Sequence, residues 1–547
     1  MTRINLSKPG LIWRTVTHLT ARQLFFQVLA RLRARPRLSL PRTAPRACFL
    51  TAPDADKPIS WQNGTFQFLN KSYSPDGEPI NWDYRYDESM DYGKLWTYNL
   101  NYFDFLNQPS MSPSAGLHLI HDFIQKTDSL RDGLETYPTS LRIINWIEFL
   151  SRHRIQQATI NRHLFAQVSL VRHRLEYHIG GNHLLENGYA LLIGSLYFQH
   201  RHWFRLAERL VRSELNRQVL VDGGHDERSP MYHQLLLDRL LTVVLALLHD
   251  TWHKDSTLVH DLSNKADQML NWLTAISFCN GDIPQVNDSA RGIAPTTVQL
   301  RLKAERVLGN HLKSTSIPQT RVMAIPLSDS GYRMFRTARY ELFADVGPIC
   351  PDHQPGHAHA DTLSFVLHVD NLPLLVDKGV STYQIGLRRD LERSTAAHNT
   401  VSIDGENSSE VWAGFRVGHR ARATVLMDTP TRLTAQHDGY RKLGVIHERT
   451  WSVEPNRLLL TDCLIGIRNR KNPSGTARFH IQPGVRVQLS DAEITVGPLY
   501  LSFSSETKPV VLITSYEMAE GFNRLCTGQC LEIQFTNYLE TTMRLIG

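Results

Sequence analysis

The chain has 547 residues, of which 41% are hydrophobic and 21% charged, the composition of a globular protein with room for two or more domains. The formal net charge of +7 is not spread evenly, because residues 1–53 hold ten basic residues and no acidic residue precedes Asp54. The rest of the chain is close to neutral. We therefore expect no nucleic-acid partner, and any site for an acidic ligand must be a local feature.

The basic N-terminal segment, residues 1–53, has its own pattern. The stretch Thr15–Ala34 predicts one amphipathic helix with arginines between the apolar residues Val16, Leu19, Leu24, Val28 and Leu32. Such a helix lies on an anionic membrane surface or packs against the protein, and the pattern leaves both open. The segment lacks the apolar core and cleavage site of a signal peptide. We expect association with the cell envelope, with a cytoplasmic location as the alternative.

A helical domain is predicted over residues 54–315. From about Leu117 to Leu308, apolar residues recur every three or four positions, and short polar connections favour antiparallel neighbours. The clearest helices are Ser140–Ser151, His163–His178, Leu184–Gln199, Phe204–Leu220, His233–His253 and Ala266–Phe278. This pattern predicts a layered or toroidal all-helical domain.

A β domain is predicted over residues 325–547, after the polar stretch Lys313–Thr320. Turn signals separate short alternating or β-branched runs, which are typical of an antiparallel β-sandwich. These runs are Tyr340–Val346, Leu363–Val369, Leu374–Val376, Asn399–Ile403, Arg449–Val453, Arg457–Leu464, Ala477–Ile481 and Val510–Thr514. The fold class is therefore α+β with several domains. The sequence does not decide whether Cys526 and Cys530 form a disulfide.

The densest polar cluster of the β half runs from Asp352 to Asp361. On extended chain, His357, His359 and Asp361 would share one face, because side chains alternate along a strand. Asp377 follows one predicted strand and His398 precedes another. Two histidines and a carboxylate at strand ends make a three-ligand divalent metal site, unless the histidines are only hydrogen-bonded there.

The helical half contributes two polar segments. In Gly181–Asn187, a helix would place Asn182 and Glu186 on one face, with His183 on an adjacent face. The alternative is an ordinary capped helix start. The second segment, Asp222–His233, puts Tyr232 in the first turn of a long helix, where unpaired N–H groups favour developing negative charge. A packing role for this tyrosine is the alternative.

Together these segments resemble the heparinase II/III family of polysaccharide lyases. Six motifs stand in the family's order over roughly residues 90–420, namely Trp96–Phe103, Tyr137–Arg142, Asn182–Asn187, Ser229–His233, His357–Asp361 and Ala396–Thr400. The resemblance implies an incomplete (α/α) toroid followed by an antiparallel β-sandwich, with an active site between them. It also implies an acidic, uronate-containing polysaccharide as substrate, cleaved by β-elimination.

The resemblance assigns roles to individual residues. Tyr232 and His357 would carry the proton transfers, assisted by Asn182, His183 and Glu186 around the substrate carboxylate. One structural zinc ion would be held by His359, Asp377 and His398. Further substrate contacts are expected from Tyr98, Asn101, Arg142, His225 and Arg228.

The chemistry explains these residue types. Removal of the C5 proton of a uronate builds negative charge beside a carboxylate, so a donor such as Asn182 must neutralise it. A tyrosine with an ordinary pKa of about 10 acts as a base only if positive neighbours lower that pKa. Arg228, His225 and the helix N-terminus are candidates for this effect. Which of Tyr232 and His357 is the base stays open.

Two other functions compete with this one. A metal oxygenase would use the histidines and carboxylate as a facial triad around iron, but it leaves Asn182 and Tyr232 without a role. A non-catalytic glycan-binding or assembly protein on a lyase scaffold predicts loss of Tyr232 or His357, and both are present. The basic N-terminal segment, in place of a signal peptide, favours a role beside synthesis or export of the cell's own acidic polysaccharide. The polymer and the oligomeric state stay open.

Overall fold

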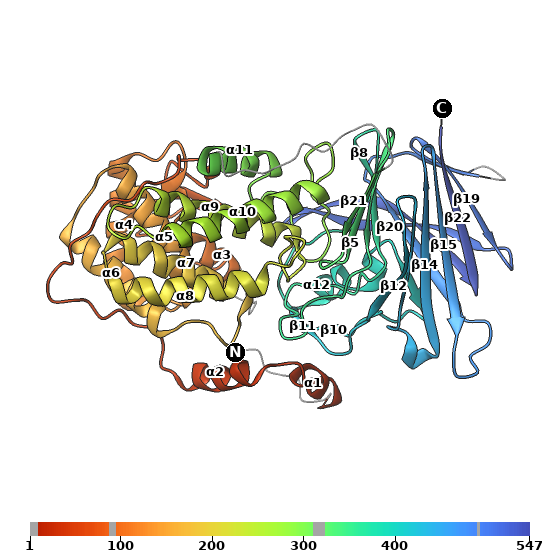
Figure 1. Ribbon diagram of the computed structural model, residues 1–547, viewed down its shortest axis with the longest axis horizontal. Helices are drawn as coiled ribbons and strands as arrows, with labels where there is room; N and C mark the ends of the chain where they lie inside the picture. Colours follow the sequence, from red (N-terminus) through yellow and green to blue (C-terminus); the bar gives the residue numbers. More distant parts are fainter. Residues whose placement is uncertain (1–8, 87–93, 310–322, 490–492, 547) are drawn as a thin grey trace.

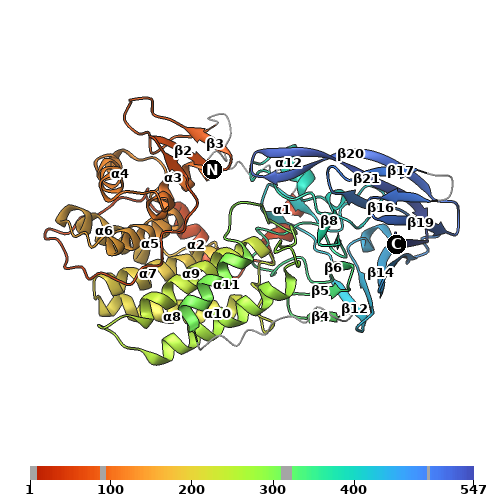
Figure 2. The same cartoon turned by 90° about the horizontal axis from the view of Figure 1, so that it is seen from above.

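The computed structural model describes residues 9–86, 94–309, 323–489 and 493–546. A helical body comes first in the chain and a β-rich body second, as Figures 1 and 2 show from two directions. The predicted α+β multidomain class is confirmed. The linker expected at Lys313–Thr320 lies outside the described residues.

The helical body consists of paired antiparallel helices around one apolar core, the arrangement of an incomplete toroid. Helix α7 is central, because it packs against α5, α6, α8 and α9. The helices of this body are α3 (Lys94–Tyr102), α4 (Pro113–Lys126), α5 (Thr136–Arg152), α6 (Ala158–His173), α7 (Gly181–Tyr197), α8 (Arg201–Gln218), α9 (Pro230–Leu248), α10 (Ser256–Ile276) and α11 (Thr297–Leu308).

Local signals set the ends of the helices that matter for the site. Ser229 caps α9 by accepting the backbone N–H of Tyr232, and Pro230 occupies the first turn, where its missing N–H costs nothing. Among the described residues, α9 alone is long and apolar enough to cross a membrane, but most of it is buried inside the helical body. Helix α10 begins ten residues before the predicted Ala266, because Asp255 caps it and Leu258 and Leu262 are buried.

The β-rich body is a sandwich of two antiparallel sheets, as predicted. One sheet has the order β12 (Ala423–Asp428), β13 (Arg432–His437), β14 (Val445–Glu454), β15 (Arg457–Gly466), β22 (Tyr538–Leu545), β19 (Leu499–Ser505), β18 (Ile494–Val496) and β17 (Val487–Leu489). The other has the order β20 (Val510–Gly521), β21 (Arg524–Thr536), β16 (Ser474–Ile481), β8 (Leu372–Leu375), β7 (Phe365–Val369), β6 (Tyr340–Asp345), β5 (Tyr332–Arg336) and β4 (Met323–Leu327), with β9 (Val401–Ile403) paired to β16.

The sandwich core lies between the two sheets, with Leu342 and Phe479 from one and Trp451 and Leu460 from the other. All six cysteines are free thiols, so Cys526 and Cys530, for which a disulfide was undecided from the sequence, do not form one. Two small elements lie at the edge of the sandwich facing the helices, the hairpin β10 (Val411–Trp412) and β11 (Arg416–Val417), and α12 (Leu387–Glu392).

Two predictions for the N-terminal part need correction. The expected single helix Thr15–Ala34 is two helices, α1 (Pro9–Val16) and α2 (Ala21–Leu32), because Thr20 and Gln23 form a capping box that starts a new helix. The segment before α3 is not helical but holds a small sheet, β1 (Trp61–Gln62), β2 (Thr65–Phe68) and β3 (Lys71–Tyr73). Its short strands gave too little alternation to be recognised.

Hydrogen bonds join the two bodies closely. The guanidinium of Arg336, on β5, donates to the carbonyl oxygens of Ala275 and Ser277 at the end of α10. The indole N–H of Trp272 donates to the hydroxyl of Ser330. Because these partners are buried and paired, the relative position of the bodies is fixed, and with it the position of the site between them.

Candidate active site

The structure brings Tyr232 and His357 together across the boundary of the two bodies. Their rings stack with centroids 3.9 Å apart and an interplanar angle of 28°. Tyr232 comes from the first turn of α9 and His357 from the loop before β7. Both side chains are only partly buried, so they lie at the surface that a bound glycan could reach.

Asp288, between α10 and α11, holds His357 in place. One carboxylate oxygen, Oδ2, lies 2.9 Å from Nδ1 of His357, and the other, Oδ1, lies 3.0 Å from Nε2 of His359. Both oxygens also accept from the guanidinium of Arg389 on α12, at 2.5 and 2.7 Å. Burial raises the pKa of Asp288, but Arg389 and the two histidines lower it well below its ordinary value. The carboxylate is therefore ionised and accepts all four hydrogen bonds.

This arrangement fixes the tautomer of His357. An ionised carboxylate can only accept, so Nδ1 of His357 carries the proton and donates it to Asp288. The second nitrogen, Nε2, is then the one that can offer a lone pair. It lies 3.4 Å from the amide nitrogen of Asn182 and 3.4 Å from a carboxylate oxygen of Glu227. His357 is thereby prepared to take a proton at Nε2.

Asn182 is positioned by Glu227. The Glu227 carboxylate accepts the backbone N–H of Asn182 at 2.8 Å and its side-chain N–H at 3.1 Å. Although burial raises the pKa of Glu227, the nearby His357 and His225 and the Asn182 N–H lower it below its ordinary value. The side-chain oxygen of Asn182 is buried without a partner, which is costly unless a ligand or water completes it. Asn182 therefore has unused hydrogen-bonding capacity beside His357.

Tyr232 is held in its protonated form. Burial, the hydroxyl of Tyr383 at 3.3 Å, and the negative charges of Asp288 and Glu227 raise its pKa well above the ordinary value. This result corrects the expectation that Arg228 and His225 lower that pKa. The Arg228 guanidinium points away, donating to the carbonyl oxygens of Asp226, Asp329 and Ser330. Burial also lowers the pKa of His225 to about 4, so its ring is neutral.

Among the other residues predicted to take part in catalysis, His183 and Glu186 lie close by on α7. The His183 ring packs against that of Tyr137 at a tilt of 31°, with centroids 4.1 Å apart, and its Nδ1 is 3.4 Å from the Glu176 carboxylate. Glu186 is buried 3.4 Å from the guanidinium of Arg239, and burial raises its pKa to about 7. Only His183 is exposed enough to contact a sugar directly. Glu186 lies behind the site.

The predicted substrate contacts divide into two groups. Tyr98 on α3 is partly exposed, and burial raises its pKa well above the ordinary value, so it is a phenol at neutral pH. Tyr137 on α5, which was not predicted as a contact, is also partly exposed, and burial raises its pKa in the same way. Four other residues have almost no exposed surface and hydrogen-bond to other groups of the protein, namely Asn101, Arg142, His225 and Arg228. In this structure these four position backbone and side chains of the protein.

The Asp352–Asp361 segment is a loop, not the extended strand that the period of two assumed. His357 and His359 nevertheless meet at Asp288, because that carboxylate offers one oxygen to each ring. The carboxyl of Asp361 is close enough to His398 and Asp377 for their charges to affect its pKa. It is buried, one of its oxygens has no partner, and burial raises its pKa to about 6.

The residues predicted to hold a metal fit a divalent cation in part. Burial lowers the pKa of His359 to about 4, and since Nε2 donates to Asp288, the lone pair on Nδ1 has no partner. In His398, Nδ1 lies 2.6 Å from Asp377 and the buried Nε2 has no partner, with the two histidine rings 5.3 Å apart. Within the described part of the chain, however, no three His, Cys, Asp or Glu side chains converge in ligand geometry. The zinc ion stays a prediction.

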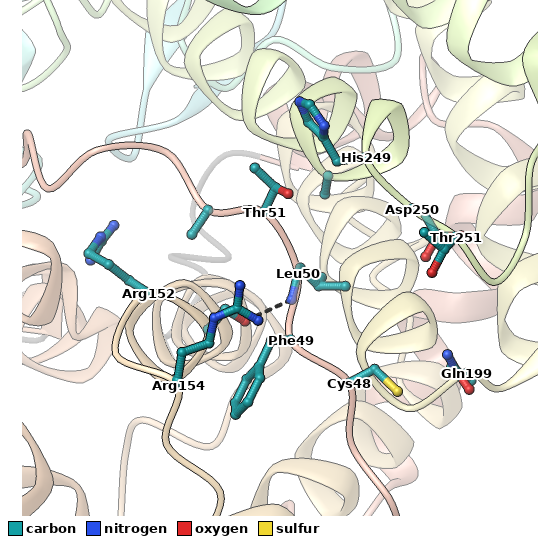
Figure 3. A pocket seen from close by; sticks show the side chains of 13 residues that line it. Cys48, Phe49, Leu50, Thr51, Arg152, Arg154, Gln199, His249, Asp250 and Thr251 are labelled. Atoms are coloured by element: carbon teal, nitrogen blue, oxygen red, sulfur yellow. Dashed lines mark hydrogen bonds between the residues drawn. The ribbon is translucent and has the colours of Figure 1, made fainter.

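A surface cavity lies elsewhere in the helical body, and Figure 3 shows it from close by. Its wall includes Arg152, Arg154, His249 and Asp250, at the ends of α5 and α9 away from Tyr232. None of the predicted site residues lines it. The candidate active site is therefore identified by its side chains and not by this cavity.

Sequence reasoning missed four residues of this site, namely Glu227, Asp288, Tyr383 and Arg389. Glu227 lay inside a recognised polar segment, so its place beside Asn182 could have been suspected. Asp288, Tyr383 and Arg389 stand in segments without a chemical pattern, and they reach the site only through the packing of the two bodies.

Comparisons with known proteins agree with this architecture. The heparinase II/III N-terminus family matches residues 83–304, and the heparinase II/III-like C-terminal family matches residues 320–532. A crystal structure of heparinase III shares the fold at 16% identity and a TM-score of 0.70, covering 99% of this chain and 93% of that one.

Two more distant solved structures share the fold. A heparan sulfate lyase mutant from Pedobacter heparinus matches at 16% identity and a TM-score of 0.59, over 100% of this chain and 92% of that one. A chondroitin AC lyase from Streptomyces coelicolor, solved with chondroitin sulphate, matches at 9% identity and a TM-score of 0.51, over 83% and 74%. No curated protein sequence matches. With both family matches covering most of its length in the expected order, the chain belongs to the heparinase II/III family of polysaccharide lyases.

Proposed function

We propose that this lyase cleaves an acidic, uronate-containing polysaccharide by β-elimination at Tyr232 and His357. The observation that carries the proposal is the stacked pair itself, with His357 oriented by Asp288 and Tyr232 kept protonated. The two residues thus offer complementary groups, Nε2 of His357 with a lone pair and Tyr232 with a proton to give. Elimination needs such a base and such an acid around one sugar.

The reaction would proceed as follows. Nε2 of His357 takes the proton from C5 of the uronate, and the electron pair left behind forms the C4–C5 double bond. The C4–O bond breaks, and Tyr232 gives its hydroxyl proton to the departing glycosidic oxygen. The Asp288 carboxylate stabilises the positive charge that His357 acquires, because it already accepts the Nδ1 proton.

Asn182 is the proposed contact for the substrate carboxylate. Its amide N–H groups face Glu227 and His357, and a bound carboxylate would take the N–H now directed at His357. That exchange neutralises charge on the substrate as the C5 proton leaves, and it frees Nε2 of His357 at the same moment. His183, paired with Glu176, is the proposed second donor.

The zinc ion remains a structural proposal. His359 and His398 would supply the two ring nitrogens that now lack partners, with Asp377 beside them. When bound, the ion would tie the loop that carries His357 to the start of β9. The acid and base chemistry stays with Tyr232 and His357.

We further propose a place at the cell envelope, in the synthesis or export of the cell's own acidic polysaccharide. The basic, amphipathic helices of the N-terminal segment support it.

A non-catalytic glycan-binding role is the second candidate function, and one experiment separates it from catalysis. The purified protein is incubated with a panel of uronate polymers while ultraviolet absorbance reports the unsaturated product. We expect absorbance to rise with at least one polymer. Binding without any absorbance change would leave the glycan-binding role instead.

A further inference from the structure

Part of the apolar surface of the N-terminal helices faces solvent. Helix α1 has no buried residue, and the only buried residue of α2 is the polar Gln23. Phe25, Val28 and Leu32 are 65%, 56% and 78% exposed, and their spacing of three and four places them along one side of α2. A helix that only completes a globular fold turns such a stripe inward.

Polar groups, in contrast, hold these helices to the protein. Arg14 forms a two-bond ion pair with Glu410, at 2.7 and 2.8 Å. The Gln23 side chain donates to the carbonyl oxygen of His353 at 2.9 Å, in the loop that carries His357. Phe26, whose ring is tilted against that of Tyr177 with centroids 4.7 Å apart, is the aromatic contact on this inner side. These helices are therefore attached mainly by polar contacts and one aromatic contact, while an apolar stripe of α2 stays exposed.

Positive charge accompanies the exposed apolar stripe. Arg31, Arg33, Arg35 and Arg37 follow one another at every second position and are exposed or partly exposed. In the part of the chain that the structure describes, no acidic side chain pairs with any of them. Aromatic and aliphatic side chains next to unpaired arginines are the features by which interfacial helices bind anionic lipid.

From this combination we infer that α1, α2 and residues 33–46, here called the N-terminal strap, form a docking surface for an anionic lipid bilayer. The occupant is a lipid surface because it alone takes up both an apolar stripe and a row of cations; an acidic polymer would need only the cations. The inference goes beyond the proposed function and does not depend on which polymer is cleaved.

The strap touches both bodies of the protein. Helix α1 lies against the hairpin region of the sandwich, where Thr15 accepts the indole N–H of Trp412 at 3.1 Å. Helix α2 lies against the helical body, where the Arg22 guanidinium is 3.8 Å from the centre of the Tyr177 ring (Figure 1). A docked strap would therefore hold both bodies, and the site between them, in one orientation relative to the bilayer.

Flotation of the full-length protein with vesicles tests the inference. We expect binding to phosphatidylglycerol-containing vesicles, weak binding to phosphatidylcholine vesicles, and release as salt screens the arginines. The triple variant Phe25→Ser, Val28→Ser, Leu32→Ser should bind anionic vesicles at least roughly tenfold more weakly. The double variant Val298→Ser, Leu302→Ser is the matched control, since these residues are 59% and 52% exposed on one side of α11. It should bind like the unchanged protein.

The remaining outcomes also decide the matter. Both variants should keep the melting temperature and the activity on soluble substrate, because no changed residue contacts the site. Equal binding of anionic vesicles by the triple variant and the unchanged protein would refute the inference that the strap binds a lipid surface. Displacement from vesicles by a soluble acidic polysaccharide, with the triple variant still binding that polymer fully, would assign the strap to the polymer instead.

Discussion

One carboxylate oxygen of Asp288 lies 2.9 Å from Nδ1 of His357, and the other lies 3.0 Å from His359. Asp288 belongs to the helical body and both histidines to the sandwich. A single buried carboxylate therefore orients the proposed base from across the domain boundary and reaches the proposed zinc ligand next to it. Arg389 holds this carboxylate in turn, so the proton-transfer geometry depends on the two bodies staying together.

Removal of the Tyr232 hydroxyl should abolish most activity. Tyr232→Phe should lower kcat by roughly 10²-fold or more, the scale of a positioned acid, with the melting temperature nearly unchanged. The rate of ultraviolet absorbance increase measures it. Tyr383→Phe is the matched control, because it removes only the hydroxyl 3.3 Å from that of Tyr232 and should cost less than about tenfold. An equal loss in both variants would refute Tyr232 as the sole proton donor.

Asp288→Asn should reduce turnover and stability together. An amide cannot accept from Arg389 and both histidines, so we expect kcat to fall roughly 10²-fold and unfolding free energy to fall by about 3 kcal/mol. The sandwich offers a control in Asp462, a buried carboxylate bonded to His447 and Arg449. Asp462→Asn should lower stability but leave the turnover of folded protein unchanged. A similar loss of turnover in both variants would show that only stability was affected.

Elemental analysis tests the zinc ion. We expect about one zinc or similar divalent ion per chain, and His359→Ala or His398→Ala should lose it, because each removes a ring nitrogen that now lacks a partner. Chelation should lower the melting temperature of the unchanged protein, since a metal bound only by the folded state stabilises it. Equal metal content in the unchanged protein and both variants would refute the assignment of His359 and His398 as ligands. His357→Ala should keep the metal and lose only turnover.

Asp226 should give stability a pH dependence. Burial and the neighbouring Glu227 raise its pKa to about 8, above its unfolded value of about 4. The folded state then binds more protons at Asp226 between those values, so the contribution of this group to stability is fully present below about pH 4 and is lost as pH rises to about 8. Asp226→Asn should flatten this slope when melting temperature is measured from pH 5 to 9. Glu410→Gln is the control, since its pKa of about 2 lies below that range. Glu186 and Asp361, with pKa values of about 7 and about 6, keep their own share of the slope in both proteins, so only a slope that is unchanged in Asp226→Asn would exclude this group.

Local sequence determined much of the fold and part of the site. Ser229 and Pro230 fix the start of α9, and with it the place of Tyr232 in the first turn. The apolar period of Leu184–Gln199 predicted α7 to within a few residues, and with it the face that carries Asn182. The alternation of the β half predicted the sandwich. Each of these features depends on neighbours within a turn of helix or a few residues of strand, which a linear pattern records.

Tertiary structure decided the rest. Asp288 lies 69 positions from His357, and Arg389 lies 101 positions from Asp288, so no spacing rule connects them. The charge around Tyr232 was predicted with the wrong sign, because Arg228 is near in sequence but its guanidinium bonds the carbonyl oxygen of Ser330. The sequence also did not decide whether the apolar residues of the N-terminal helices face solvent or the rest of the protein. Protonation and orientation depend on which groups are brought within a few ångströms, and in this protein the packing of two bodies determines that.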